Sequence, residues 1–248
     1  MKTRYFSMAI VFSMFLLAGC TSDGPAPTKS ASLGIKFSSS ALVAAGANSG
    51  RMSATDFLLT GFSVSVADVV IEENSGNDGE SDGNNNDGRK AKKEDKNEGA
   101  EAEDIVLPGP FLLDLASGSA SIEQVAVYPG TFKKIDFTFS PSSSADFGGS
   151  SIVIAGDYTM ADGSVVSVLL QSDFDQQIQL PLANGGVTVA NNSSVDLSVT
   201  LDANGLLSTV DLASAMIVGG TITINKANNA DLLAQFETVL SQYIDVED

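Results

Sequence analysis

Short runs in which apolar and polar residues alternate recur along most of this chain of 248 residues. In the clearest run, Val195, Leu197, Val199 and Leu201 alternate with Asp196, Ser198 and Thr200. Successive side chains of a β-strand point to opposite faces, so each such run predicts a strand with one buried face. Glycine, serine, asparagine and aspartate between the runs indicate tight turns. The pattern predicts an all-β domain, an antiparallel β-sandwich, over residues 31–225.

The predicted strands follow one another at short intervals. They cover residues 33–37, 56–73, 111–115, 125–127, 131–139, 152–154, 165–170, 178–182, 187–189, 195–201 and 222–224. Within residues 56–73, residues 62–66 place their apolar side chains in one phase and residues 69–71 in the other. A shift by one residue turns every side chain to the opposite face, so a β-bulge or a break is expected near Ala67-Asp68.

Two dipeptides that end in glycine indicate turns. Asp162-Gly163 lies between two predicted strands and is typical of a type I′ hairpin turn. Asn204-Gly205 indicates a second turn after the strand that ends at Leu201. Residues 206–216 fit neither a strand nor a helix pattern clearly.

An amphipathic helix is predicted within residues 226–248, at the C-terminus. Asn228 can cap its first turn, with Asp231 three residues later as the reciprocal partner in a capping box. The apolar residues that share one helix face are Leu232, Leu233, Phe236, Val239, Leu240 and Tyr243. We expect this face to pack against the sandwich, and residues 245–248 to form an acidic tail.

Residues 74–104 differ from the rest of the chain in composition. They contain no aliphatic residue larger than alanine, ten acidic residues and five basic ones. Without apolar surface to bury, such a segment cannot offset the entropy cost of ordering it, so we predict a disordered acidic insertion in the sandwich. An EF-hand loop starting at Asp82 or at Asn74 fails the required glycine and glutamate spacing. The alternative is a weak cation site in this insertion. The five basic residues of the insertion lie among acidic residues that cancel their electric field, so a mixed-charge solvated stretch is favoured over a ligand site.

The N-terminus has the pattern of a secretory signal peptide. Lys2 and Arg4 precede an apolar run, residues 6–17, which is shorter than the roughly 20 residues that cross a bilayer as a helix. The run closes in Leu17-Ala18-Gly19-Cys20, which holds the only cysteine of the chain. This tetrapeptide resembles a lipobox, the recognition site of the bacterial lipoprotein signal peptidase.

The lipobox resemblance implies cleavage after residue 19 and a diacylglycerol on the sulfur of Cys20, with a further fatty acid such as palmitate on its amino group. Two or more acyl chains anchor a protein stably to a membrane, where one does not. The alternative is a plain secretory signal, residues 1–19, followed by an unrelated cysteine. Residues 20–30 are polar and contain proline, so they are predicted to be the acylated cysteine and a flexible tether.

The same resemblance implies a location and a partner. The expected location is the cell envelope, and the partner is the membrane, through the lipid on Cys20. Thr21 follows the cysteine, and the lack of aspartate there resembles the outer-membrane default of Gram-negative sorting. The outer membrane is therefore favoured if the cell is Gram-negative.

The composition excludes several kinds of active site. The chain has no histidine, so it holds no Ser-His-Asp or Cys-His arrangement and no zinc site of the usual His/Cys type. The net charge is −18, and loss of Lys2 and Arg4 with the signal makes it −20, which opposes binding to nucleic acid. We predict no catalytic residue, no metal ligand and no cofactor, and an unknown protein or glycan as the ligand.

Asp173 and Asp175 are the carboxylate pair considered for catalysis. They lie two residues apart, on one face if the segment is extended, and a pair about 5–10 Å apart could act in glycoside hydrolysis. The simpler interpretation is two exposed residues at the rim of a sheet. Asp68, Asp114 and Asp136 lie within strand patterns and are predicted to face solvent.

Four segments, TGFSVSVADVVIEE, GPFLLDL, VAVYPGTFKKIDFTF and TITINKANNADLLAQFE, follow one another in this order. Together they resemble a family of bacterial surface lipoproteins known as a domain of unknown function. The resemblance implies a transthyretin-like (prealbumin-like) β-sandwich at the cell surface, and it supplies no catalytic residue. Fimbrillin-type pilus proteins, which have comparable sandwiches and lipoprotein precursors, are a looser analogy.

Three hypotheses about function follow from these patterns. The first is a lipid-anchored binding or structural module of the cell envelope without catalysis. The second is an anchor or subunit of a surface fibre that is assembled by strand exchange. The third is an acidic-residue glycoside hydrolase that uses Asp173 and Asp175.

Overall fold

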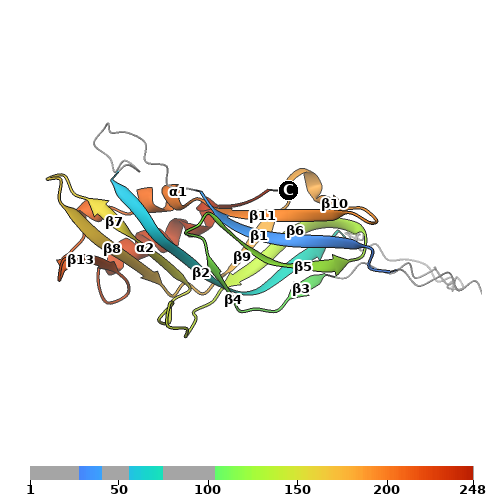
Figure 1. The fold of residues 1–248 in the computed structure, drawn as a ribbon, viewed down its shortest axis with the longest axis horizontal. Coiled ribbons are helices and arrows are strands. Elements are labelled where there is room, and N and C mark those ends of the chain that lie inside the picture. The colour runs from blue at the N-terminus through green and yellow to red at the C-terminus, as the bar shows by residue number, and fades with distance from the viewer. Residues whose placement is uncertain (1–27, 41–55, 75–103, 248) are drawn as a thin grey trace, which may run out of the picture.

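The computed structural model describes residues 28–40, 56–74 and 104–247 (Figure 1). Its strands are β1 (Ala31–Ser39), β2 (Phe57–Glu73), β3 (Ile105–Leu107), β4 (Phe111–Asp114), β5 (Ser119–Val127), β6 (Gly130–Phe139), β7 (Ile152–Thr159), β8 (Val165–Ser172), β9 (Gln177–Pro181), β10 (Val187–Val189), β11 (Ser194–Leu201), β12 (Ile217–Val218), β13 (Thr221–Ile224) and β14 (Ile244–Glu247). Its helices are α1 (Ala203–Ser208) and α2 (Ala230–Val239), with short 3-10 helices η1 (Ala183–Gly185), η2 (Leu212–Ser214) and η3 (Leu240–Tyr243). The strands form two multi-stranded sheets, so the described part of the chain is mainly β, as the alternation predicted.

The smaller sheet, sheet A, has the order β14-β11-β1-β5. Its two inner strands are β11 and β1, and β1 runs parallel to β11 and antiparallel to β5. The parallel pair departs from the purely antiparallel sandwich expected from the sequence. The inward side chains of β1, Leu33, Ile35 and Phe37, are at most 1% exposed.

The larger sheet, sheet B, is built on the long strand β2. On one edge of β2, residues 57–64 pair with β7 and residues 66–73 with β6. Strands β4 and β3 pair with the other edge. The register with β6 shifts between Val66 and Val69, which confirms the bulge predicted near Ala67-Asp68.

The strands β6 and β7 each pair with further strands on the edge that faces away from β2. Strands β9 and β10 pair with β6, and β8 pairs with β7. Strand β13 then runs parallel to β8, and β12 forms the outer edge. Residues 140–151 separate β6 from β7, and residues 173–176 separate β8 from β9.

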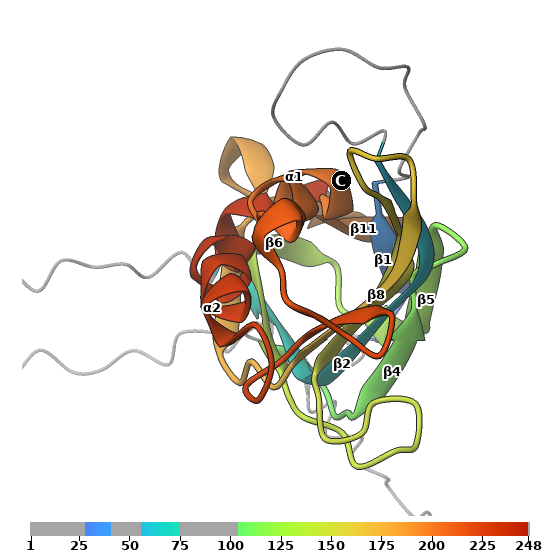
Figure 2. The ribbon, with the colours of Figure 1, turned by 90° about the vertical axis from the view of Figure 1, so that its left-hand side faces the viewer.

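The two halves of the elongated molecule are covered differently. In one half, sheet A lies over β6, β9 and the second part of β2 (Figure 1). In the other half, α1 and α2 lie across from β8 and β2 (Figure 2). Leu232, Leu233 and Phe236 of α2 are buried there. Helices therefore take the place of a second sheet at that end.

Aromatic rings connect these parts of the core. The ring of Phe37 in sheet A meets that of Phe137 in sheet B edge to face, with centroids 5.3 Å apart. Phe137 meets Phe139 at 5.5 Å, and Phe139 meets Phe174 at 6.0 Å, also edge to face. The chain of contacts runs from the sandwich to the junction with the helical half.

The hairpin at Asp162-Gly163 forms, but its turn is not type I′. The N–H of Gly163 donates to the carbonyl of Met160 (2.9 Å), and the N–H of Met160 donates to the carbonyl of Ser164 (2.8 Å). Gly163 has a φ of +85°, whereas Asp162 is not among the described residues with positive φ. A type I′ turn needs positive φ at both central residues, so this loop is a type I turn followed by a left-handed glycine.

Asn204-Gly205, predicted as a turn, lies inside helix α1. The side chain of Asp202 accepts a hydrogen bond from the N–H of Gly205 (3.0 Å) and caps the helix. Leu206 and Leu207 are then buried. The capping aspartate and the two leucines outweigh the local turn preference of the Asn-Gly pair.

Helix α2 starts differently from the predicted capping box. Asn229, with a φ of 51°, precedes the helix and makes no side-chain capping bond. Its amide group instead accepts from the N–H of Met216 (2.7 Å) and donates to the carbonyl of Thr223 (2.8 Å). Asn229 therefore ties the start of α2 to the β12–β13 region.

The end of the chain also departs from the prediction. Helix α2 stops at Val239 and is followed by η3 and β14. The segment expected as an acidic tail is a strand that pairs with β11. Ile244 and Val246 are 6% and 7% exposed, so the apolar half of this acidic segment is buried in sheet A.

Several predictions fall outside the described residues. They concern the signal peptide at residues 1–19 and the first part of the tether at residues 20–30. The acidic insertion at residues 74–104 is described only at its two ends, Asn74 and Asp104.

Candidate functional site

A groove separates the edges of the two sheets at one end of the sandwich. Within the described residues, β3 pairs with β2 alone and β5 with β1 alone, so each has one free edge. A hollow of about 200 Å³ lies between them, lined by Lys29, Asp104, Ile105, Val106, Leu107, Val125, Ala126, Val127, Tyr128 and Phe132. We call this hollow the edge groove. Val106 is 57% exposed, which leaves an apolar side chain beside unpaired backbone groups.

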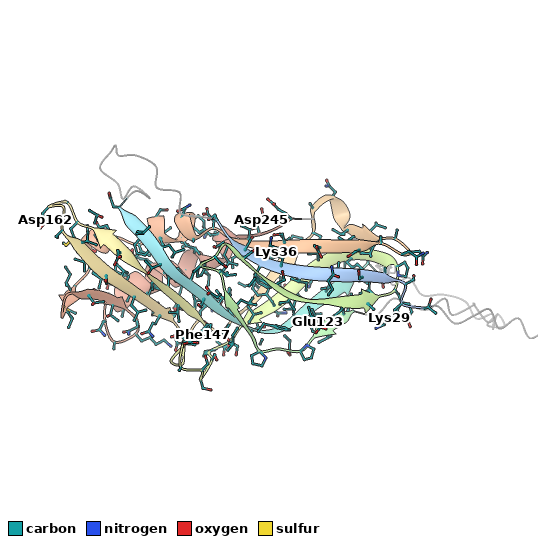
Figure 3. The ribbon with its side chains drawn as sticks, in the orientation of Figure 1. Lys29, Lys36, Glu123, Phe147, Asp162 and Asp245 are labelled. Atoms are coloured by element: carbon teal, nitrogen blue, oxygen red, sulfur yellow. The ribbon has the colours of Figure 1, made fainter. Side chains whose placement is uncertain are left out.

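The chain enters the fold beside the edge groove. Lys29, two residues before β1, places its Nζ 5.7 Å from the ring centroid of Tyr128, a cation–π distance. Lys29 and Asp162 lie at opposite ends of the long axis (Figure 3). The first described residues therefore lie at the end of the domain opposite the β7–β8 hairpin.

A second hollow, of about 480 Å³, lies between β9 and the second half of α2. Its lining residues are Phe174, Gln176, Gln177, Ile178, Ala234, Glu237, Thr238 and Ser241. We call it the helix hollow. The Oγ of Ser172, a residue with no exposed surface, donates to Oε1 of Glu237 (2.6 Å). This bond holds the carboxylate at the wall of the hollow.

The two aspartates considered for catalysis have different surroundings. Asp173 lines a third, shallower hollow, where its Oδ2 is 2.5 Å from Nζ of Lys226. Asp175 is exposed and does not line that hollow. Asp173 thus faces a lysine rather than a second carboxylate.

A charged cluster lies on the outer face of sheet B. Nζ of Lys134 is 2.7 Å from Oε1 of Glu72 and 3.0 Å from Oδ2 of Asp136. Gln177 and Gln179 donate weakly to the same Oδ2, at 3.5 and 3.4 Å. Asp136 is only 3% exposed, and its Oδ1 is buried without a partner among the described residues. The solvent-facing prediction for Asp136 is wrong because long neighbouring side chains cover it.

The protonation of this cluster follows from its contacts. The hydrogen bond from Lys134 lowers the pKa of Glu72, and the bonds to Glu72 and Asp136 raise the pKa of Lys134. Lys134 therefore stays protonated and is the cation shared by the two carboxylates. Burial, with a smaller contribution from Asp104, raises the pKa of the neighbouring Glu73.

The predicted lipidation residues Leu17, Ala18, Gly19 and Cys20 lie outside the described residues. Among the residues that are described, no group of three or more acidic or cysteine side chains could hold a metal ion. No helix in the described ranges is both long and apolar enough to cross a bilayer.

The sequence analysis predicted neither the edge groove nor the helix hollow. The helix hollow joins residues 174–178 to residues 234–241, and the edge groove joins residue 29 to residues 104–107 and 125–132. No motif links segments so far apart, because only the strand order brings them together.

The comparisons with known proteins give no match. The sequence matches no protein family, no curated protein and no solved structure.

Proposed function

We propose that this protein is a lipid-anchored β-sandwich of the cell envelope that acts as a binding or structural module without catalysis. The observation that carries the proposal is the position of the edge groove and Lys29 at the end of the domain from which the chain leads to Cys20 (Figure 3). A lipid on Cys20 would hold that end near the membrane. The β7–β8 hairpin at Asp162 would then point away from the membrane.

The sequence supports the cellular location in this proposal. The Leu17-Ala18-Gly19-Cys20 tetrapeptide follows an apolar run of signal-peptide length. We propose the outer membrane as the location if the cell is Gram-negative, and a transthyretin-like type of sandwich. Two features of the structure support a binding role: a hollow walled by polar side chains and a groove between free strand edges.

A fractionation experiment combined with a pulldown tests this proposal. The full-length chain should partition with membranes, and the Cys20→Ser variant should be soluble. Crosslinking of the acylated protein in its native envelope, followed by purification, should recover a protein or glycan partner. A Cys20→Ser variant that is still cleaved after residue 19 and still sediments with membranes would contradict the lipid anchor.

A second proposal is that the chain is an anchor or subunit of a surface fibre. The edge groove favours it, because the free edges of β3 and β5 could accept an extended strand from another subunit. Strand β1 is an inner strand of sheet A, so removing residues 31–40 would remove buried side chains as well as a strand that could be exchanged.

A charge placed in the edge groove separates assembly from folding. Val106 is 57% exposed, so Val106→Lys should leave the melting temperature unchanged and abolish polymers seen by native electrophoresis or electron microscopy. The matched control is Val165→Lys, at a residue 62% exposed at the start of β8, which should still polymerise. Polymers that form equally well with Val106→Lys would contradict strand exchange at this groove.

A further inference from the structure

The helix hollow has one rigid wall made by the segment between β8 and β9. The carbonyl of Phe174 accepts a hydrogen bond from Oγ of Ser151 (2.6 Å), and its N–H donates to Oγ of Ser172 (3.1 Å). The ring packs edge to face against Phe139, with centroids 6.0 Å apart. Both backbone groups and the ring of Phe174 are therefore fixed, although the residue is only half-buried.

The opposite wall carries a fixed carboxylate. Glu237 lies on α2, and Oγ of the fully buried Ser172 donates to its Oε1 at 2.6 Å. This bond uses one of the two carboxylate oxygens and sets the orientation of the group. A carboxylate held in this way is a pre-organised hydrogen-bond acceptor for a ligand in the hollow.

The other polar lining groups donate or accept hydrogen bonds. Gln176 contributes a carboxamide and Ser241 a hydroxyl. The hydroxyl of Thr238 already donates to the carbonyl of Ala234 (2.7 Å), so it can only accept from a ligand. Ile178 and the ring of Phe174 add apolar surface. None of the described lining residues is a lysine or an arginine, so a phosphate or another anion would find no counter-charge.

From these groups we infer that the helix hollow binds a neutral saccharide of one or two units. Sugar hydroxyls both donate and accept, as the carboxamide of Gln176 and the hydroxyl of Ser241 do, and the C–H face of a pyranose can pack on the Phe174 ring. The volume of about 480 Å³ falls within the range of small-molecule sites, roughly 300–1,000 Å³. This inference rests on the proposed binding function and assigns its ligand class.

The test uses the full-length chain in a detergent without a sugar headgroup. Saturation-transfer difference NMR is recorded with glucose, galactose, mannose, N-acetylglucosamine, cellobiose and lactose, and with glucuronate and spermidine as charged probes. At least one neutral sugar should give a saturable signal, and glucuronate should give none. The absence of a signal from all six neutral sugars would overturn the inference.

Substitutions then locate the site. Gln176→Ala and Glu237→Ala should each weaken the bound sugar about fivefold to tenfold, the effect of losing one or two hydrogen bonds. Glu237→Gln keeps an acceptor oxygen without the charge and should bind within about threefold of the parent chain. The matched control is Gln171→Ala, beside Asp173 in the third hollow, which should change nothing.

Each contrary outcome has a distinct meaning. Sugar binding that survives both alanine substitutions would place the ligand elsewhere and overturn the assignment. Spermidine binding that is lost in Glu237→Gln, without sugar binding, would make the hollow a cation site instead. Membrane partition of the same preparation is measured separately, so a failed sugar titration leaves the lipid-anchor proposal standing or falling on its own evidence.

Discussion

Phe37 and Phe137 meet edge to face across the sandwich, with their ring centroids 5.3 Å apart. Phe37 belongs to an inner strand of sheet A and Phe137 to β6 of sheet B, so this contact joins the two layers. Neither residue is more than 1% exposed. The first strand after the predicted tether is thus an integral part of the core of this chain.

Replacement of Phe37 by alanine tests that conclusion. We expect Phe37→Ala to lower the free energy of unfolding by about 3–5 kcal/mol, because it leaves a cavity between the sheets. Denaturant unfolding followed by circular dichroism measures the change. Lys36→Ala, at the exposed neighbour on β1, should stay within about 0.5 kcal/mol. Equal, small effects of the two substitutions would show that β1 does not pack in the core of its own chain.

Gly109, which lies against the bulge of β2, gives a second prediction. The chain between β3 and β4 crosses the bulge so closely that a Cβ on Gly109 would overlap the carbonyl oxygen of Ala67. The N–H of Gly109 also donates to Oδ1 of Asp68 (3.2 Å). Gly109→Ala should therefore cost about 1–3 kcal/mol of stability. In Gly61→Ala the new methyl makes an ordinary contact, 3.4 Å from Cβ of Ala155, so the melting temperature should hardly change.

Loss of Lys134 gives a third prediction. Lys134→Met would leave Glu72 and the nearly buried Asp136 without their shared cation. We expect a loss of about 1–3 kcal/mol at pH 7, measured by denaturant unfolding. Lys226→Ala breaks an ion pair whose lysine is 72% exposed, so it should have a clearly smaller effect than Lys134→Met.

The loss of stability in Lys134→Met should also depend on pH. Lys134 lowers the folded-state pKa of Glu72 below its ordinary value of 4.5. The stabilisation from this contact is therefore complete above the ordinary pKa and is lost as the pH falls through the lowered value. The deficit of Lys134→Met should be largest at pH values above 4.5 and shrink as the pH falls through the lowered pKa of Glu72. A deficit that is constant over this range would mean that Lys134 acts through packing alone.

The insertion gives a fourth prediction. Its two ends are held together, since the N–H of Glu73 donates to Oδ1 of Asp104 (3.2 Å) and β2 pairs with β3. Replacing residues 75–103 by a short Gly-Ser linker should leave the melting temperature within a few degrees, because loop length adds little to the cost of closure. A large drop in melting temperature would show that the insertion packs on the domain.

The strands that could be predicted are those with a clean alternation. Residues 195–201 and 131–139 each present one apolar face, and both form strands at the expected places. Strand β3 was missed, because its Ile-Val-Leu run has no alternation and stands beside the acidic insertion. Its partner β2 stabilises it as a strand, which is a tertiary effect.

Sheet order and helix ends required the structure. Nothing in the composition of β1 or β11 shows that they pair in parallel, since residues 33–37 and 195–201 alternate like any other strand. The segment at Ile244 and Val246 does alternate, but it is only four residues long and acidic. A short pattern of this kind becomes a strand only because β11 offers a free edge.

The candidate sites were the least predictable part of the molecule. Glu237 was one polar residue on a helix predicted from its apolar face, and Phe174 was one aromatic residue between two strands. Their proximity depends on how α2 packs against β8, which no local pattern reveals. Lipidation is the opposite case, because its recognition depends on a short local sequence around Cys20.

The most direct test of the account is the mass of the N-terminal peptide of the protein taken from its native envelope. We predict a mature chain that begins at Cys20, with a diacylglycerol on the sulfur and a fatty acyl group on the amino nitrogen. An unmodified Cys20 thiol, or a mature N-terminus at another residue, would contradict the membrane anchor and the proposed function that depends on it.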